Sequence, residues 1–185
     1  MQKFMKTFFD PRGVFTTRNL AVMAMLIAVR YVLSQFTIAP TPQFKMFTLA
    51  YIPTAMAAAL YGPWAALVFG FVGDTVGYMA KPIGPYFPGY AISEMLAAFI
   101  YACFSYRQRI TLAKMTAARL LILITVIFGL NFVWGSMQFG TAASGFFTSV
   151  RLWNNLVQLP VYVFFSTWAA KFAVRMEARR ENITG

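Results

Sequence analysis

The apolar residues of this chain gather in six runs, separated by short polar or Pro/Gly-rich stretches. A helix that crosses the hydrocarbon core of a membrane, which is ~30 Å thick, needs about 20 mostly apolar residues. Runs of this kind predict transmembrane helices. The predicted spans are Thr17–Thr37, Thr48–Tyr61, Pro63–Ala80, Gly89–Tyr106, Thr116–Gln138 and Val150–Phe172.

The second and third spans are shorter than the others and are separated only by Tyr61-Gly62-Pro63-Trp64. A Gly-Pro pair breaks a helix, so this stretch predicts a tight helical hairpin. The third span also carries Gly70, Gly73 and Gly77 at spacings close to one helical turn. Small residues at such spacing favour close packing of one membrane helix against another.

The composition agrees with a membrane protein. Of the 185 residues, 59% are hydrophobic and 11% are charged, whereas soluble domains carry about 25% charged residues. We therefore predict an all-α integral membrane protein, a six-transmembrane-helix bundle that forms a single membrane domain over residues 1–185. The bundle would occupy residues 17–172, between an N-terminal segment (1–16) and a basic tail (173–185).

The formal net charge of +11 is unevenly distributed. Basic residues precede the first span, follow the sixth, and lie in the loop after the fourth, where they are Arg107, Arg109, Lys114 and Arg119. The positive-inside rule makes all three regions cytoplasmic, including both termini, in a multi-pass protein of the plasma membrane. This clustering also argues against nucleic acid as a partner. The mixed basic and aromatic N-terminal segment is unlike a cleavable signal peptide.

The polar residues inside the spans fall mainly in the outer half of the predicted bundle. Arg30, for example, lies 12 residues beyond Arg18, which is about 18 Å along a helix. The inner halves are almost purely apolar, so the pattern describes a cup that opens outward. Hydrogen bonds between helices are the alternative use of such residues. The residues at this depth are Arg30, Asp74, Glu94, Asn131, Trp134, Gln138, Arg151, Asn154, Asn155 and Gln158, and Tyr90 shares a helical face with Glu94.

Three charged residues of this set raise separate questions. Arg30 and Asp74 could form a buried ion pair with a structural role, because an unpaired charge at this depth is costly. Glu94 follows a Pro/Gly-rich loop that leads into an apolar helix within Gly84–Tyr101. An ionisable residue inside a membrane span is a functional candidate by default.

The first span has a second distinctive face. Ala21, Ala24 and Ala28 form a stripe of small residues that lies about 150° from Arg30 around the helix, at 100° per residue. This stripe can pack against another helix of the same chain or dock onto a separate membrane subunit.

Several kinds of chemistry are excluded by the residues that the sequence lacks. It has no phosphate-binding Gly-x-x-x-x-Gly-Lys-Ser/Thr loop, so the chain is not expected to hydrolyse ATP itself. It has no histidine for a Ser–His or Cys–His pair or for a metal site, and its one cysteine, Cys103, rules out an internal disulfide. We expect no enzyme, metal or cofactor. Two readings remain: a binding subunit powered by other proteins, or an ion-coupled secondary carrier that uses Asp74 or Glu94 as its relay.

Several motifs taken together resemble the substrate-binding S components of energy-coupling-factor (ECF) vitamin transporters, and most of all the folate-specific S component. They are Gly62-Pro63-Trp64, Gly73-Asp74 with Gly77, Pro85-Tyr86-Phe87-Pro88-Gly89-Tyr90 running into Leu96–Tyr101, Arg151 followed by Pro160, and Ala24-x-x-x-Ala28. The resemblance implies a helical bundle that captures a vitamin at its outer face. It also implies that the alanine stripe docks onto a transmembrane coupling subunit, which works with two ABC-type ATPases. In such a transporter the S component topples in the lipid bilayer to release its cargo.

Folate, the ligand that the resemblance implies, suits the predicted cup. Its two carboxylates would bind Arg30, Arg151, Lys45 or Lys81, and arginine would do so with two hydrogen bonds. Its pterin ring would stack on Trp134, Phe87 or Tyr90. Glu94 or Asp74 would accept hydrogen bonds from the N–H groups of the pterin. The side-chain amides of Asn154, Asn155 and Gln158 would form hydrogen bonds with its amide edge. The outer loops would close over it through Pro40, Lys45, Lys81, Pro85 and Tyr86. A queuosine precursor or a pyrimidine is the alternative ligand.

Overall fold

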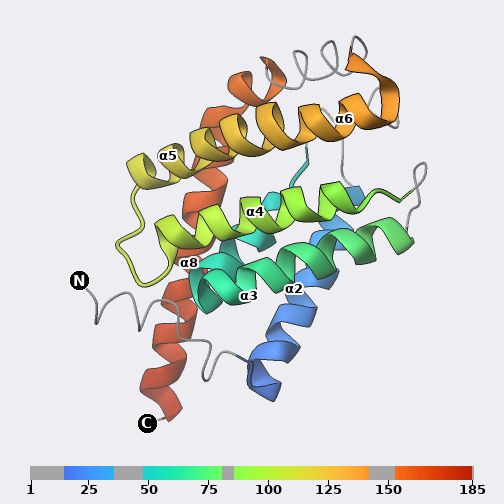
Figure 1. Ribbon diagram of the computed structural model, residues 1–185. Coiled ribbons are helices and arrows are strands. Elements are labelled where there is room, and N and C mark those ends of the chain that lie inside the picture. The colour runs from blue at the N-terminus through green and yellow to red at the C-terminus, as the bar shows by residue number, and fades with distance from the viewer. Residues whose placement is uncertain (1–14, 36–47, 81–85, 142–152, 185) are drawn as a thin grey trace, which may run out of the picture.

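The computed structural model describes residues 15–35, 48–80, 86–141 and 153–184, and the regular elements within these ranges are all helices (Figure 1). A short helical stretch at 153–157 precedes the last helix. The predicted all-α class is confirmed for this part of the chain. The named elements are α2 (Thr17–Gln35), α3 (Tyr51–Ala80), α4 (Pro88–Ser105), α5 (Leu112–Ile122), η1 (Leu123–Leu130), α6 (Asn131–Phe139) and α8 (Leu159–Thr184).

Three helical stretches in the described ranges are long and apolar enough to cross a membrane. They are Thr17–Gln35, Tyr51–Ala80 and Leu112–Gln138. Many large apolar side chains on these helices are exposed, among them Met25, Phe71 and Ile124. Such surfaces are stable against lipid rather than water, so the chain is a helical membrane protein.

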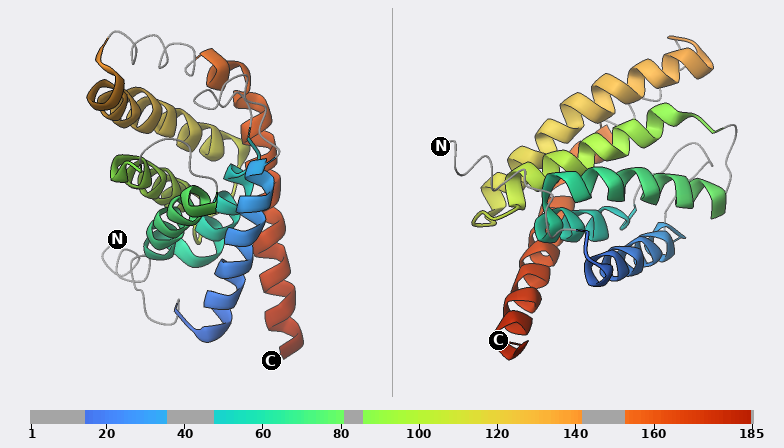
Figure 2. Two further views of the ribbon diagram at one scale, coloured as in Figure 1. Left: turned by 90° about the vertical axis from the view of Figure 1, so that its right-hand side faces the viewer. Right: turned by 60° about the horizontal axis from the view of Figure 1, so that its bottom comes forward.

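Helix α3 consists of two helices that meet at Gly62. The backbone of Gly62 has φ 80° and ψ −172°, a conformation that glycine adopts without the steric cost paid by other residues. The aromatic ring of Tyr106 lies 2.8 Å from the position that a Cβ atom at Gly62 would occupy. Figure 2 shows the two halves of α3 running in different directions. The predicted break between the second and third spans is therefore confirmed.

The fifth predicted span is one continuous run of α5, η1 and α6. It begins at Leu112, because the Thr111 side chain caps the helix by accepting a hydrogen bond from the Lys114 backbone N–H. Its middle, Leu123–Leu130, is a π-helix, a rare form that often accompanies functional sites. The prediction that Arg119 belongs to a charged cytoplasmic loop was wrong: Arg119 lies inside α5 and is 8% exposed.

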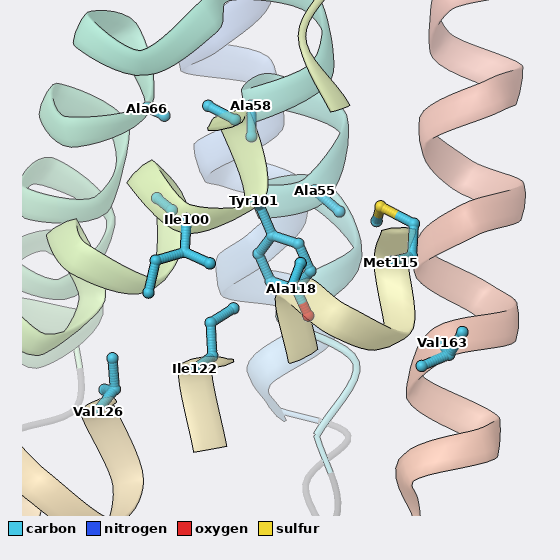
Figure 3. Packing of buried hydrophobic residues seen from close by; sticks show 12 residues of the cluster. Ala55, Ala58, Ala66, Ile100, Tyr101, Met115, Ala118, Ile122, Val126 and Val163 are labelled. Carbon is cyan, nitrogen blue, oxygen red and sulfur yellow. The ribbon is translucent and has the colours of Figure 1, made fainter. Parts of the chain in front are cut away.

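The core is built from small side chains at the crossing of α3, α4, α5 and α8 (Figure 3). Alanine residues dominate it, so the helix axes can approach closely. At Gly70, a Cβ atom would lie 2.8 Å from the backbone of Glu94 and Met95, so α3 and α4 touch there through their main chains. The cluster includes Ala55, Ala58, Ala66, Ala98, Ala102, Ala118, Tyr101 and Met115.

Helix α2 packs on α3 through Met23 and Leu26. Ala21, Ala24 and Ala28 are exposed, so no helix of the described chain covers the alanine stripe. Within the described residues, the stripe is therefore not a face for packing against another helix of the chain. Arg18 at the start of α2 lies 3.6 Å from Glu177 of α8, so these two ends of the bundle lie on one side, as Figure 1 also shows.

Candidate ligand-binding site

An ion pair joins α2 to α4. The Nη2 atom of Arg30 lies 2.6 Å from Oε2 of Glu94. The Arg30 side chain is only 11% exposed, whereas that of Glu94 is 41% exposed. Arg30 and Glu94, two of the predicted charges, are thus brought together, and among the described residues the partner of Arg30 is Glu94 rather than the suggested Asp74. Glu94 can still present part of its carboxylate to a ligand.

Gly73 makes room for this arginine. The Nη1 atom of Arg30 is buried without a hydrogen-bond partner and packs so closely over Gly73 that a Cβ atom there would collide with it. Gly73 thus accommodates a side chain, whereas Gly70 allows two backbones to touch and Gly77 faces open space. The glycine pattern therefore serves helix packing at Gly70 and the site at Gly73.

Aromatic side chains meet where α4 begins and α6 passes. The rings of Phe87 and Trp134 are 5.6 Å apart between centroids, and those of Phe87 and Tyr90 are 5.9 Å apart. Gly89 lies beneath them: a Cβ atom there would lie 2.7 Å from the Trp134 ring and would also collide with Phe87. The predicted aromatic residues are therefore together, and a flat ring could stack on them.

A hydrogen-bond chain fixes this tryptophan. Trp134 Nε1 donates to Ser93 Oγ at 3.2 Å, and Ser93 Oγ donates to Asn131 Oδ1 at 2.9 Å. Tyr90 donates to Gln138 Oε1 at 3.4 Å. Ser93 and Glu94 are neighbours on α4 but contact α6 and α2 respectively, so this part of α4 is the centre of the site.

A second polar group lies among α3, α5 and α8. Arg119 donates from Nη2 to Asn155 Oδ1 at 2.6 Å, and its guanidinium lies 4.0 Å from the centre of the Tyr162 ring. The Tyr51 and Tyr162 ring centroids are 4.3 Å apart. Arg119 is the eighth residue of α5 and Asn131 begins α6, so this group lies some distance along the same helical run from the aromatic group.

Arg119 was not among the polar residues predicted to share one depth, but the structure bonds it to Asn155, which was. Gln158 joins the short stretch 153–157 to α8: its backbone N–H donates to the Asn154 carbonyl at 3.1 Å, and its carbonyl accepts from the Tyr162 N–H at 3.0 Å. Its side-chain Nε2 lies 3.4 Å from Asn154 Oδ1.

Of the other predicted site residues, Asp74 and Tyr86 lie within the described chain. Asp74 is half-buried on α3. Tyr86 is exposed, with its hydroxyl 3.4 Å from Thr75 Oγ1 and its ring 4.9 Å from that of Tyr78. The other residues predicted for loops and for carboxylate binding lie outside the described residues: Pro40, Lys45, Lys81, Pro85 and Arg151.

Sequence reasoning missed Ser93, Arg119 and Tyr51 as members of polar groups. A serine within an apolar helix carries no recognisable signal, since it often bonds to its own backbone. Arg119 could have been recognised, because the apolar residues of the fifth run extend on both sides of it.

The profile of the family described as ECF-type riboflavin transporter, S component, matches residues 14–168. The chain belongs to this family. The resemblance inferred from its motifs is thereby confirmed, and the S component is a subunit of a membrane transporter.

Named relatives of this S component are folate transporters. The folate transporter FolT of Clostridium novyi (strain NT) is 29% identical over 155 residues, which are 84% of this chain and 89% of that protein. FolT of Leuconostoc mesenteroides subsp. mesenteroides is 26% identical over 171 residues, which are 90% of each chain. The crystal structure of FolT bound with folic acid matches with a TM-score of 0.76 and 29% identity, over 85% of this chain and 95% of that one.

Proposed function

We propose that this S component binds folate for an ATP-driven importer in the plasma membrane, together with a transmembrane coupling subunit and two ABC-type ATPases. The observation that carries the proposal is the similarity of its fold, over most of both chains, to the FolT structure that contains folic acid. The family description names riboflavin instead, so riboflavin is the competing ligand.

The outer half of α4 offers groups that suit a pterin. Phe87 and Trp134 provide aromatic faces for stacking. Glu94, still partly exposed while it is paired with Arg30, can accept amino and ring N–H protons. Asp74, Asn154, Asn155 and Gln158 remain proposed contacts, and Tyr86 with the outer loops is the proposed gate.

Titration of the purified protein tests this ligand assignment. We expect tight, near-stoichiometric binding of folate that riboflavin, a pyrimidine or a queuosine precursor does not displace, because a site with specific hydrogen-bonding groups rejects ligands that lack the matching ones. Tight binding of riboflavin together with no binding of folate would refute the proposal.

Trp134→Ala is expected to weaken folate binding. Loss of stacking on an aromatic side chain costs about 1–3 kcal/mol, or roughly 5- to 150-fold in the dissociation constant. Isothermal titration of the purified variant measures this change. Trp168→Ala is the matched control, since Trp168 is 60% exposed on α8 and stacks on Phe172, away from the candidate site. An equal loss of affinity in both variants would contradict the prediction.

The proposed topology is a single domain of six spans with both termini cytoplasmic. The described helices supply six stretches if α3 is counted as two helices at Gly62, and if the short stretch 153–157 joins α8. Arg109, exposed between α4 and α5, would then lie inside the cell. Arg109→Cys, in a Cys103→Ala background, tests this orientation with a thiol reagent that does not cross the membrane. Labelling of this cysteine from outside intact cells would overturn the proposed orientation.

Reconstitution separates the proposed subunit from a self-sufficient carrier. Proteoliposomes with this chain alone should accumulate no folate, whereas addition of the coupling subunit, ATPases and ATP should allow uptake. Uptake by the chain alone, driven by a proton or sodium gradient, would favour the ion-coupled carrier instead.

We propose that the exposed face of Ala21, Ala24 and Ala28 docks onto the coupling subunit. A bulky substitution, Ala24→Leu, should reduce uptake without changing folate affinity.

A further inference from the structure

A positive charge is buried in the second polar group of the bundle. Arg119 is 8% exposed, although it lies in a helical run that is long and apolar enough to span the membrane. Its contacts are with neutral groups: the amide oxygen of Asn155 at 2.6 Å and the ring face of Tyr162 at 4.0 Å. The Nε atom of Arg119 is buried and has no hydrogen-bond partner.

Further unsatisfied donors come from two neighbouring helices. The hydroxyl groups of Tyr51 on α3 and Tyr101 on α4 are also buried without hydrogen-bond partners. Both tyrosines lie within electrostatic range of one another, and Tyr51 within range of Arg119. Figure 3 shows Tyr101 extending from α4 with its hydroxyl directed toward α5, beside Ala118. Buried donors of this kind are rare in native proteins unless something binds them.

The charge of Arg119 has no carboxylate partner among the described residues. The ion pairs there are Arg18–Glu177 and Arg30–Glu94. A buried charge that lacks a counter-ion is strongly unfavourable. A guanidinium flanked by hydroxyl donors matches the oxygen atoms of a carboxylate, which accept hydrogen bonds and carry the missing negative charge.

We propose that Arg119, with the hydroxyls of Tyr51 and Tyr101, binds a carboxylate of the glutamate tail of folate. This inference rests on the proposed function. Arg30, which was predicted to bind a folate carboxylate, is already paired with Glu94. Arg119 precedes Trp134 by fifteen residues along one helical run, a separation on the order of 20 Å, so an elongated ligand can place its ring at one group and its carboxylate at the other.

The test compares folate with its diamide, in which both glutamate carboxylates are converted to amides. Titrations of the full-length protein in detergent give the ratio of the two dissociation constants. In the wild type the diamide should bind about 30-fold or more weakly, as expected for a buried charge pair. In Arg119→Gln, the affinity for folate should fall by a similar factor while the affinity for the diamide changes little, so the ratio of the two dissociation constants approaches one. The control Arg109→Gln removes an exposed arginine and should leave the ratio unchanged.

Three results would overturn the assignment: equal binding of folate and diamide by the wild type, an unchanged ratio in Arg119→Gln, or equal weakening of both ligands by that variant. Arg119→Lys keeps the charge but loses the planar guanidinium fork, so it should give an intermediate ratio of the two dissociation constants. This variant replaces Arg119→Gln if the glutamine variant does not fold. An Arg119→Lys ratio equal to that of the wild type would then overturn the assignment. Absence of folate binding by the wild type would instead refute the proposed function.

Discussion

Replacing Glu94 with leucine is expected to lower the free energy of unfolding by about 3–5 kcal/mol, because it leaves a buried arginine without its counter-ion. The Arg30 side chain is 11% exposed, and its Nη1 atom already lacks a partner. Arg30→Leu should cost less, since the Glu94 side chain is 41% exposed and can turn toward a more polar environment. Thermal unfolding of the purified variants in detergent measures this difference.

The double variant Arg30→Leu/Glu94→Leu serves as the control for this pair. Replacing both partners by apolar groups removes the uncompensated charge, so most of the stability lost in Glu94→Leu should return. If the double variant were as unstable as the sum of the single variants, the two side chains would act independently. A smaller loss in Glu94→Leu than in Arg30→Leu would contradict the assigned burial.

Gly70→Ala is expected to destabilise the bundle by about 1–3 kcal/mol through overpacking. The new Cβ atom would lie 2.8 Å from the backbone of Glu94 and Met95. Main-chain atoms cannot rotate away as a side chain can, so α3 and α4 must separate. Because Glu94 belongs to the candidate site, folate affinity should fall together with the melting temperature.

Gly77→Ala is the matched control on the same helix. A Cβ atom at Gly77 meets nothing within 4 Å, and alanine favours a helix over glycine by about 1 kcal/mol. This variant should be as stable as the wild type or slightly more stable. A loss of stability in Gly77→Ala as large as that in Gly70→Ala would show that helix flexibility, and not the contact of α3 with α4, explains the glycines.

The pairing of Arg30 with Glu94 connects two parts of the proposed mechanism. Arg30 lies on the helix that carries the exposed Ala21, Ala24 and Ala28, whereas Glu94 lies beside the aromatic residues proposed to hold the pterin. A ligand that competes for Glu94 would loosen the connection between α2 and α4. The stability of the pair is therefore relevant to ligand binding as well as to folding.

The sequence by itself determined the class of protein, the helix break and the family resemblance. Long apolar runs, a Gly-Pro pair at residues 62 and 63, and short motifs are local features whose energetic consequences do not depend on distant residues. Helix α4, predicted as Gly89–Tyr106 and observed as Pro88–Ser105, illustrates how well such signals place an element.

The tertiary structure decided which polar side chains meet. It paired Arg30 with Glu94, joined Ser93 to Asn131 and Trp134, and buried Arg119 against Asn155. These contacts depend on the rotation, tilt and lateral order of whole helices, and on a π-helix that changes the direction in which later residues point. Packing between distant segments sets all of these, so a one-dimensional pattern identifies the polar residues of a membrane bundle without identifying their partners.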